Sequence, residues 1–403
     1  MKTYLTYDDV NIIPKYSELG SREDVKLNTR FTKNTELQIP IVTSPMDTVT
    51  ELDMAKFMLD WGGVGVIHRF MSIEKQSKMM NSLFDQWKSF WTPFYEEHNT
   101  THEEEYNEWL KQVSLWNSPP TKSDWVDLKE RFGFVDERIQ MDDEWLSRPL
   151  CGAISVTGDY KERAQELVKN GCNVLLIDIA HGHHVLLKNV TEELKNEFGR
   201  NVEIIGGSIA TKEATKDLCE WGVDGIRVGI GNGSLCETRI RTGVGLPQIT
   251  VLSDVCSVAD DYSVPCIADG GIRYVGDVSK AIGAGADTVM LGSLVAGTKE
   301  TPGDTHKVGE WPNEKLFKKY RGSASLDSKS DRGESNNVEG NSTIIPYKGK
   351  VYRIISDIRD GLSSSFSYVG ADNILDFQSK CEFVRVTPAG TIEGQPHLLA
   401  TKI

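Results

Sequence analysis

The sequence predicts a TIM (β/α)8 barrel, and two observations lead to that fold class. First, eight short runs are rich in β-branched or apolar residues, and from the third onward they alternate with amphipathic stretches such as 161–170 and 211–222. Second, polar and glycine residues gather where these runs end. Continuous apolar strands that alternate with helices indicate a parallel sheet covered on both faces. Eight such units favour a closed barrel over an open sheet.

The eight predicted strands follow one another in chain order as residues 39–45, 64–68, 150–156, 174–180, 202–207, 225–230, 264–269 and 287–293. Each ends in a short polar or glycine-rich motif, including ADGG at 268–271 and LGS at 291–293. Active sites of such barrels lie at the carboxyl ends of the strands, and the loops after strands 7 and 8 commonly bind phosphate. We therefore expect a phosphate cradle at these two motifs rather than ordinary turns.

Two segments fall outside the barrel pattern, which we place at 1–80 and 149–403. Residues 81–148 hold six of the nine tryptophans (87, 91, 109, 116, 125 and 145) and supply −8 of the net charge of −14. We expect a compact, mostly helical, acidic insertion after strand 2. Residues 323–343 nearly lack apolar side chains, so they cannot bury enough surface to order themselves. This second segment is either a mobile active-site flap or an idle surface loop.

Charge and cysteine usage limit the class of protein. The net charge of −14 argues against a nucleic-acid binder or an anionic-membrane binder, because both need a basic surface. An anionic small ligand is still possible, since glycine-loop amides bind phosphate on an acidic protein. The seven cysteines show no paired spacing, which fits a reducing compartment. The N-terminal residues lack the apolar core of a signal peptide, so we expect a cytoplasmic protein.

One cysteine follows a strand and a glycine-rich turn, in the stretch GIRVGIGNGSLCETRIRTGVG at 225–245. Glycine lets the backbone approach a ligand closely, so Cys236 is a candidate nucleophile and Thr238 a candidate proton acceptor. The alternative is a tight turn that holds a structural cysteine. The HGHH motif at 181–184 suggests metal ligands, but no carboxylate or cysteine accompanies it at ligand spacing, and a turn is favoured.

Nine motifs in fixed order carry a resemblance to a known family. They are LTYDDVNIIP, TSPMDTVTE, GGVGVIH, GIGNGSLCETR, ADGGIRY, VMLGS, YRG, VEG and PYKG. The chain resembles the family of inosine-5′-monophosphate dehydrogenase and guanosine-monophosphate reductase over 1–80 and 149–403. This resemblance implies a TIM barrel, a purine nucleotide substrate and a nicotinamide cofactor.

The resemblance also implies roles for individual residues. Catalytic roles fall to Cys236, Thr238, Arg332 and Glu339. Positions around the phosphate, ribose and purine correspond to Ser44, Met46, Arg227, Ser234, Asp269, Gly271, Gly292, Ser293, Tyr320 and Gly340. The dinucleotide contacts correspond to Asp178, Gly229 and Gly231. Carbonyls of Gly231, Gly233 and Cys236 match a potassium site that Glu393 and Gly394 of a neighbouring subunit complete, which implies a homotetramer.

The reaction implied by the resemblance is NAD-dependent oxidation of inosine 5′-monophosphate to xanthosine 5′-monophosphate. Leu326 stands where reductases carry a glutamate, whereas SYVGA at 367–371 is similar to reductases. The alternatives are an NADPH-dependent GMP reductase and a low-turnover nucleotide-binding protein that uses the insertion as its surface. The family's flap carries an Arg-Tyr pair that activates water, and here Arg332 precedes Gly333. Ser208, Ile179 and Glu237 also depart from the family's usual residues.

Overall fold

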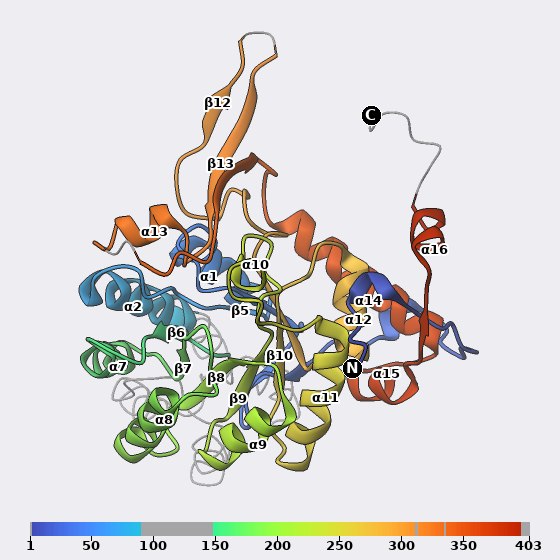
Figure 1. Cartoon of the computed structure of the whole chain (residues 1–403), viewed down its shortest axis with the longest axis horizontal. Helices are drawn as coiled ribbons and strands as arrows, with labels where there is room; N and C mark the ends of the chain where they lie inside the picture. The colour runs from blue at the N-terminus through green and yellow to red at the C-terminus, as the bar shows by residue number, and fades with distance from the viewer. Residues whose placement is uncertain (1, 90–147, 311–312, 334–335, 396–403) are drawn as a thin grey trace, which may run out of the picture.

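The computed structural model describes residues 2–89, 148–310, 313–333 and 336–395 (Figure 1). Its centre is an eight-stranded parallel sheet in the order β5-β4-β11-β10-β9-β8-β7-β6. The strands are β4 (Ile41–Thr43), β5 (Val64–Gly65), β6 (Cys151–Ile154), β7 (Val174–Ile177), β8 (Glu203–Ile209), β9 (Gly225–Val228), β10 (Cys266–Asp269) and β11 (Thr288–Leu291). Seven lie within the predicted runs, β8 extends two residues beyond the predicted run 202–207, and the predicted TIM barrel is confirmed.

The barrel closes between β5 and β6 through a single parallel bridge. Ile67, just after β5, donates from its amide to the Cys151 carbonyl at 3.0 Å and accepts from the Ala153 amide at 2.9 Å. The strands read as continuous apolar runs because both of their faces are covered. Val174, Leu175, Leu176 and Ile177 of β7, for example, are all fully buried.

Helices surround the sheet, and each buries one apolar face against it (Figure 1). They are α1 (Leu52–Asp60), α2 (Ile73–Ser89), α7 (Tyr160–Lys169), α8 (Val185–Phe198), α9 (Lys212–Glu220), α11 (Gln248–Asp261), α12 (Val275–Gly283) and α14 (Tyr352–Val369). A short helix, α10 (Thr238–Thr242), follows the loop after β9 that carries Cys236, which we call the cysteine loop. Helix α15 (Ile374–Lys380) packs beside α12 and α14. In the described part of the chain, we find no helix that combines the length and the apolar character needed to cross a membrane.

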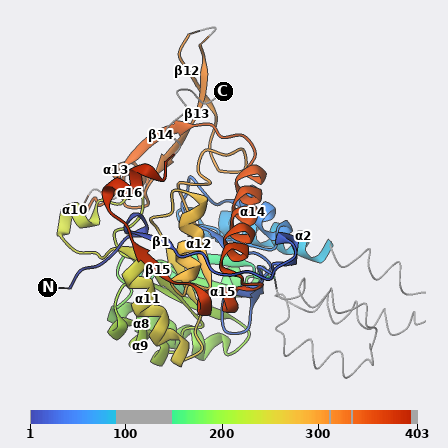
Figure 2. The ribbon, with the colours of Figure 1, turned by 90° about the vertical axis from the view of Figure 1, so that its right-hand side faces the viewer.

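The two ends of the chain meet along one side of the barrel (Figure 2). β1 (Val10–Ile12) pairs antiparallel with β15 (Phe383–Arg385), and α16 (Pro388–Glu393) follows it. Single turns of 3₁₀ helix lie at η1 (Tyr7–Asp9) and η2 (Arg22–Asp24), and β2 (Thr29–Arg30) pairs with β3 (Glu36–Leu37).

The predicted insertion boundary at residue 81 falls inside α2. Met80, Phe84 and Trp87 are all buried in the barrel's main apolar cluster. Their spacing continues one apolar helix face across the predicted boundary, so α2 is a barrel helix as far as its end at Ser89. Arg148 is also buried and donates to Gln38 Oε1 at 2.9 Å. The predicted helical character of the insertion lies outside the described residues.

A three-stranded antiparallel sheet projects from the barrel and carries the predicted flap (Figures 1 and 2). It consists of β12 (His306–Val308), β13 (Lys315–Arg321) and β14 (Ser342–Pro346), with α13 (Leu326–Ser330) between β13 and β14. The segment predicted to lack order therefore contains a short helix, which Ser325 caps by accepting from the Ser328 amide at 3.3 Å. Because this segment has few apolar side chains to bury, polar helix capping and backbone bridges hold its structure instead. Its mobility stays a prediction.

Candidate active site

A cavity of about 260 Å³ lies at the carboxyl ends of the barrel strands. It brings together almost every site residue predicted from the sequence: Ser44, Met46, Asp178, Arg227, Gly229, Gly231, Gly233, Ser234, Cys236, Thr238, Asp269, Gly271, Gly292, Ser293, Tyr320, Glu339 and Gly340. Most of these residues come from the loops after β4, β7, β9, β10 and β11 and from the β13–β14 connection, and Arg227, Asp269 and Tyr320 lie within β9, β10 and β13. The predicted residues outside its lining are Arg332, Glu393 and Gly394.

The loop after β9 holds Cys236 against the end of the flap. Gly229 has a φ of +139°, and a Cβ there would lie 2.2 Å from the Asp269 carbonyl oxygen, so only glycine fits. Cys236 forms an antiparallel bridge with Gly340, and the Glu237 amide donates to the Glu339 carbonyl at 2.8 Å. The cysteine loop and the flap end therefore form one backbone unit.

A side-chain relay leads away from the Cys236 thiol. Its Sγ donates to Thr238 Oγ1 at 3.2 Å, and Thr238 Oγ1 donates in turn to Glu339 Oε2 at 2.8 Å. A carboxylate at the end of a thiol–hydroxyl chain can accept a proton from the thiol. Thr238 was predicted as a proton acceptor, and the structure shows that its hydroxyl is hydrogen-bonded to the Glu339 carboxylate.

The other six cysteines do not line the cavity. Cys151, Cys172, Cys219, Cys256 and Cys266 are buried elsewhere, and Cys381 is half-buried. Burial raises the pKa of Cys172 to about 12 and the pKa values of Cys219 and Cys381 to about 11. The thiols of Cys172, Cys219 and Cys381 are therefore held in the protonated form, whereas Cys236 faces the cavity.

The loops after β10 and β11 form a glycine-lined recess. Gly270 and Gly271 have φ values of +91° and +84°, and a Cβ at Gly292 would meet both Ser44 Oγ and the Tyr320 hydroxyl at 3.3 Å. Tyr320 lies 3.1 Å from Ser234 Oγ, and burial raises the pKa of its hydroxyl, which keeps it a donor. Ser44 Oγ is buried without a hydrogen-bond partner. An unpartnered hydroxyl among glycine loops fits an anionic ligand such as phosphate.

Charged side chains that line the same cavity are paired with one another. Arg227 lies 3.1 Å from Asp178 Oδ1 and 3.5 Å from Asp269 Oδ2. Burial would raise the pKa of Asp178, but Arg227 and Arg69 hold it below its ordinary value. Burial raises the pKa of Asp269, and the Asp178 charge adds to that effect. Asp178 is therefore held as an anion that can accept hydrogen bonds.

Comparison with known proteins identifies the family of the chain. Residues 4–397 match a family model described as "IMP dehydrogenase / GMP reductase domain". The chain belongs to this family. It is 38% identical to the inosine-5′-monophosphate dehydrogenase of Borreliella burgdorferi, over 98% of this chain and 97% of that protein. It is 36% identical to the Cryptosporidium parvum protein of the same name, over 98% and 94%. A Leishmania donovani GMP reductase is 34% identical, over 98% and 95%.

Family membership makes the chain an oxidoreductase and confirms the resemblance carried by the nine motifs. The family model matches the chain from one end of the described barrel to the other, so the match does not depend on the cysteine loop alone. The comparisons name both activities of the family, and the choice between them rests on the site itself.

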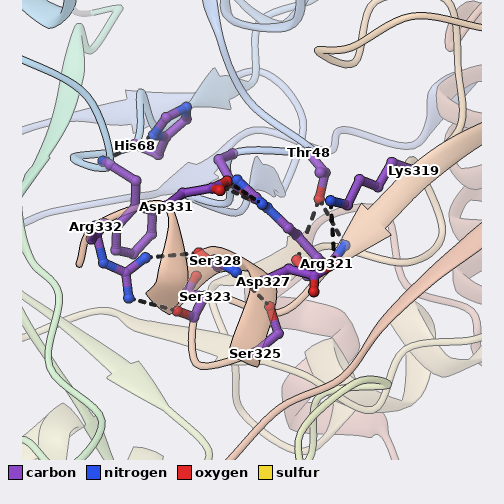
Figure 3. Close-up of polar contacts among 12 residues, drawn as sticks. Thr48, His68, Lys319, Arg321, Ser323, Ser325, Asp327, Ser328, Asp331 and Arg332 are labelled. Carbon is purple, nitrogen blue, oxygen red and sulfur yellow. Dashed lines mark hydrogen bonds and ion pairs between the residues drawn. The ribbon is translucent and has the colours of Figure 1, made fainter. Parts of the chain in front are cut away.

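The flap arginine lies beside the cavity rather than in its lining. Arg332 donates to Ser328 Oγ at 2.7 Å and to the Ser323 carbonyl at 3.1 Å (Figure 3). Its guanidinium also lies 4.6 Å from the centroid of the Phe70 ring. Ser323 itself lines the cavity. The role of Arg332 in activating water stays a prediction.

The Arg321 side chain fixes the start of the flap. Its guanidinium contacts Asp47 and Asp331 at 2.6 Å each, and its backbone amide donates to Thr48 Oγ1 at 3.2 Å. Figure 3 shows Arg321, Thr48 and Asp331 converging on this point beside α13. Asp331, which precedes Arg332, is thus connected through Arg321 to the loop after β4.

The predicted cation-site residues are divided in the structure. Gly231, Gly233 and Cys236 lie together on the cysteine loop, and the Gly233 carbonyl accepts from the Cys236 amide at 3.1 Å. Glu393 and Gly394 lie at the end of α16, which Figure 1 shows apart from α10 and the cysteine loop. Neither residue lines the cavity that the cysteine loop borders, and the contribution of a neighbouring subunit stays a prediction.

The HGHH motif is held by protein partners. His183 Nε2 lies 2.7 Å from Asp217 Oδ2, and His184 Nδ1 accepts from the Leu186 amide at the start of α8. Asp217 lies far along the sequence, so the carboxylate partner was not visible in the motif's spacing. Within the described ranges, no group of three or more histidine, cysteine or acidic side chains is arranged to hold a metal.

Two residues at the site were missed in the sequence. Arg69 lies 3.2 Å from Asp178 Oδ2, and its only signal was the polar pair that ends the second strand. Lys348 donates to the Ser293 carbonyl at 2.8 Å and the Leu294 carbonyl at 3.0 Å. It belongs to the PYKG motif, which marked the segment without indicating that its lysine supports the loop after β11.

Proposed function

We propose that the chain oxidises inosine 5′-monophosphate to xanthosine 5′-monophosphate with NAD, through a covalent intermediate on Cys236. The observation that carries the proposal is the Cys236–Thr238–Glu339 relay, which faces the same cavity as the glycine-lined recess. The recess suits the nucleotide phosphate, and the relay then faces the purine. The names of the similar dehydrogenases support the same reaction.

The residues divide the first half of the reaction between them. Glu339 accepts a proton through Thr238, and the Cys236 thiolate forms a bond to C2 of the purine while the π electrons of the C2–N3 bond move to N3. The tetrahedral carbon then loses its hydrogen as hydride, and the electron pair on N3 restores the C2–N3 double bond. NAD, when bound, supplies the acceptor for that hydride. We expect Asp178 to accept hydrogen bonds from the cofactor's ribose, and the lowering of its pKa by Arg227 and Arg69 supports that role.

Hydrolysis completes the reaction. A water oxygen attacks C2 of the thioimidate, the water's proton passes to a base, and the bond from C2 to Cys236 Sγ breaks to release product. The two candidate bases are Arg332, by resemblance, and Glu339, through Thr238. Because Gly333 gives Arg332 no aromatic neighbour in the flap, we expect hydrolysis to be slower than hydride transfer.

We further propose that potassium binds the carbonyl oxygens of Gly231, Gly233 and Cys236. Carbonyl oxygens are suitable ligands for a hard cation, and the Gly233 carbonyl keeps one lone pair beyond its bond to the Cys236 amide. Glu393 and Gly394 of a neighbouring subunit would complete the site in a homotetramer. A cytoplasmic location accords with the free cysteines.

A GMP reductase is the second candidate, because one 34% identical relative carries that name and SYVGA resembles reductases. Against it, Leu326 occupies the reductase glutamate position, and its side chain is exposed at the start of α13. The leucine at position 326 argues against the reductase activity. Other carboxylates still face the cavity, so acid–base groups remain there.

The deciding experiment follows absorbance at the nicotinamide band. Inosine monophosphate with NAD and guanosine monophosphate with NADPH are run side by side on the full chain. We expect cofactor reduction with the first pair alone and none with Cys236→Ala, which should still bind the nucleotide. Turnover of the second pair alone would assign the reductase, and normal turnover by Cys236→Ala would overturn the covalent mechanism.

A further inference from the structure

One aromatic ring in the loop after β5 contacts two guanidinium groups. The Arg332 guanidinium carbon lies 4.6 Å from the Phe70 ring centroid, and that of Arg69 lies 4.7 Å from it. Both distances lie within the range in which an aromatic quadrupole attracts a cation. Phe70 therefore joins the flap to the barrel loop from which Arg69 reaches Asp178.

The Phe70 ring is held by a buried histidine. The Phe70 amide donates to His68 Nδ1 at 3.0 Å, and the two rings are stacked with centroids 5.9 Å apart. Because Nδ1 accepts, a neutral His68 carries its hydrogen on Nε2, which lies 3.2 Å from Glu51 Oε1. Lys75 binds the same carboxylate oxygen at 3.0 Å. His68 is only 1% exposed, so the ring rests on a rigid support.

The flap has no aromatic residue next to its arginine. Gly333 has a φ of +75°, and a Cβ added there would meet no atom within 4 Å. The hydrogen bonds from Arg332 to Ser328 and Ser323 stay inside the flap segment. The Phe70 contact instead connects the guanidinium to the barrel, next to the Ser323 edge of the cavity.

We propose that Phe70 is a positioning residue whose ring seats Arg332 at the edge of the cavity. This inference rests on the proposed function, in which Arg332 activates water. A seated guanidinium spends more time in reach of the covalent intermediate than one on an unsupported flap. A cation–π contact of ordinary strength changes that population about 2- to 30-fold.

Phe70 also contacts Arg69, so the effect of the ring on Arg332 must be distinguished from its effect on Arg69. Arg69 lies 3.2 Å from Asp178, so a change at the ring could also act on the cofactor side of the cavity. An effect through Asp178 would alter the first turnover and the KM for NAD. An effect through Arg332 would lower the steady rate and leave the first turnover unchanged.

The kinetic test compares the parent with Phe70→Leu, Phe70→Trp, Arg332→Ala and the Phe70→Leu/Arg332→Ala double variant in stopped flow. Phe57→Leu is the matched control, since Phe57 is half-buried and stacks on Trp61 with centroids 5.6 Å apart, outside the cavity. We expect Phe70→Leu to lower the steady rate about 2- to 30-fold with an unchanged burst, and Phe70→Trp, which keeps an aromatic ring, to retain the parent's steady rate. Phe70→Leu should have no further effect in the Arg332→Ala background.

An unchanged or increased steady rate in Phe70→Leu would overturn the proposal, as would an equal loss in the Arg332→Ala background. A second measurement does not need turnover: tryptic cleavage after Arg332 should be about 2- to 30-fold faster in Phe70→Leu than in the parent. Equal cleavage would overturn the seat. Failure of the parent to reduce NAD, with cleavage still accelerated, would instead refute the proposed function.

Discussion

Replacing Glu339 by glutamine should leave the active site folded but remove the proton acceptor of the relay. Glu339 Oε2 lies 2.8 Å from Thr238 Oγ1, which lies 3.2 Å from the Cys236 thiol. The amide keeps an oxygen acceptor in similar space but cannot take a proton at neutral pH. A hydrogen bond to a charged group contributes about 1.5–3 kcal/mol, or roughly 10- to 150-fold. Loss of general-base catalysis typically costs about 10²–10⁴-fold, so we expect a steady rate at least about 10²-fold lower.

Stopped-flow absorbance at the nicotinamide band separates the first turnover from the steady rate. Thr238→Val breaks the same relay at its middle, so its loss should match that of Glu339→Gln. The double variant should be no slower than either single variant, because residues that act as one unit are not additive. Glu237→Gln is the matched control, since this neighbouring carboxylate binds Arg241 at 2.7 Å and does not line the cavity.

Two outcomes would refute the relay. A Glu339→Gln variant with the parent's steady rate would show that the carboxylate takes no proton. Losses that multiply in the double variant would show that Thr238 and Glu339 act independently, despite the hydrogen bond between them.

Three further predictions address the flap, the cation and pH. The parent should show a burst of reduced cofactor comparable to the enzyme concentration and then a slow steady rate. Gly333→Tyr should raise that steady rate without enlarging the burst, and Arg332→Ala should lower it; linear progress curves with an active Arg332→Ala would contradict this. Turnover should fall when lithium replaces potassium, and light scattering should find a tetramer; equal activity or a monomer would count against the cation site. Burial raises the pKa of Asp287 from 3.8 to about 6, with Arg30 partly opposing it. The folded state therefore binds this proton more tightly, and the stabilising contribution is complete below the unfolded pKa and lost as pH rises through about 6. Asp287→Asn should remove up to about 3 kcal/mol of pH dependence from the free energy of unfolding, measured by denaturant titration; an unchanged dependence would refute it.

Local sequence patterns were sufficient for the barrel, whereas most of the individual site residues came from the resemblance to a known family. A buried parallel strand needs a short apolar run, and its carboxyl end needs residues that turn the chain, so all eight strands could be located. The glycines around Cys236 and after β10 and β11 report positive φ angles and close backbone approach, which are local requirements. Because the strands are parallel, their carboxyl ends meet at one edge, and the predicted residues gather there.

Tertiary structure decided which distant side chains meet. Thr238 and Glu339 lie 101 residues apart, and Asp178 and Arg69 lie 109 apart, so no local pattern pairs them. Tryptophan content placed the start of the insertion at residue 81, whereas the buried Trp87 continues the apolar face of α2 into the barrel core. The contact of Arg332 with Phe70 likewise depends on how the flap folds back. Backbone conformation and burial are set by neighbours along the chain, but pairing between loops is set by where the closed barrel places their ends.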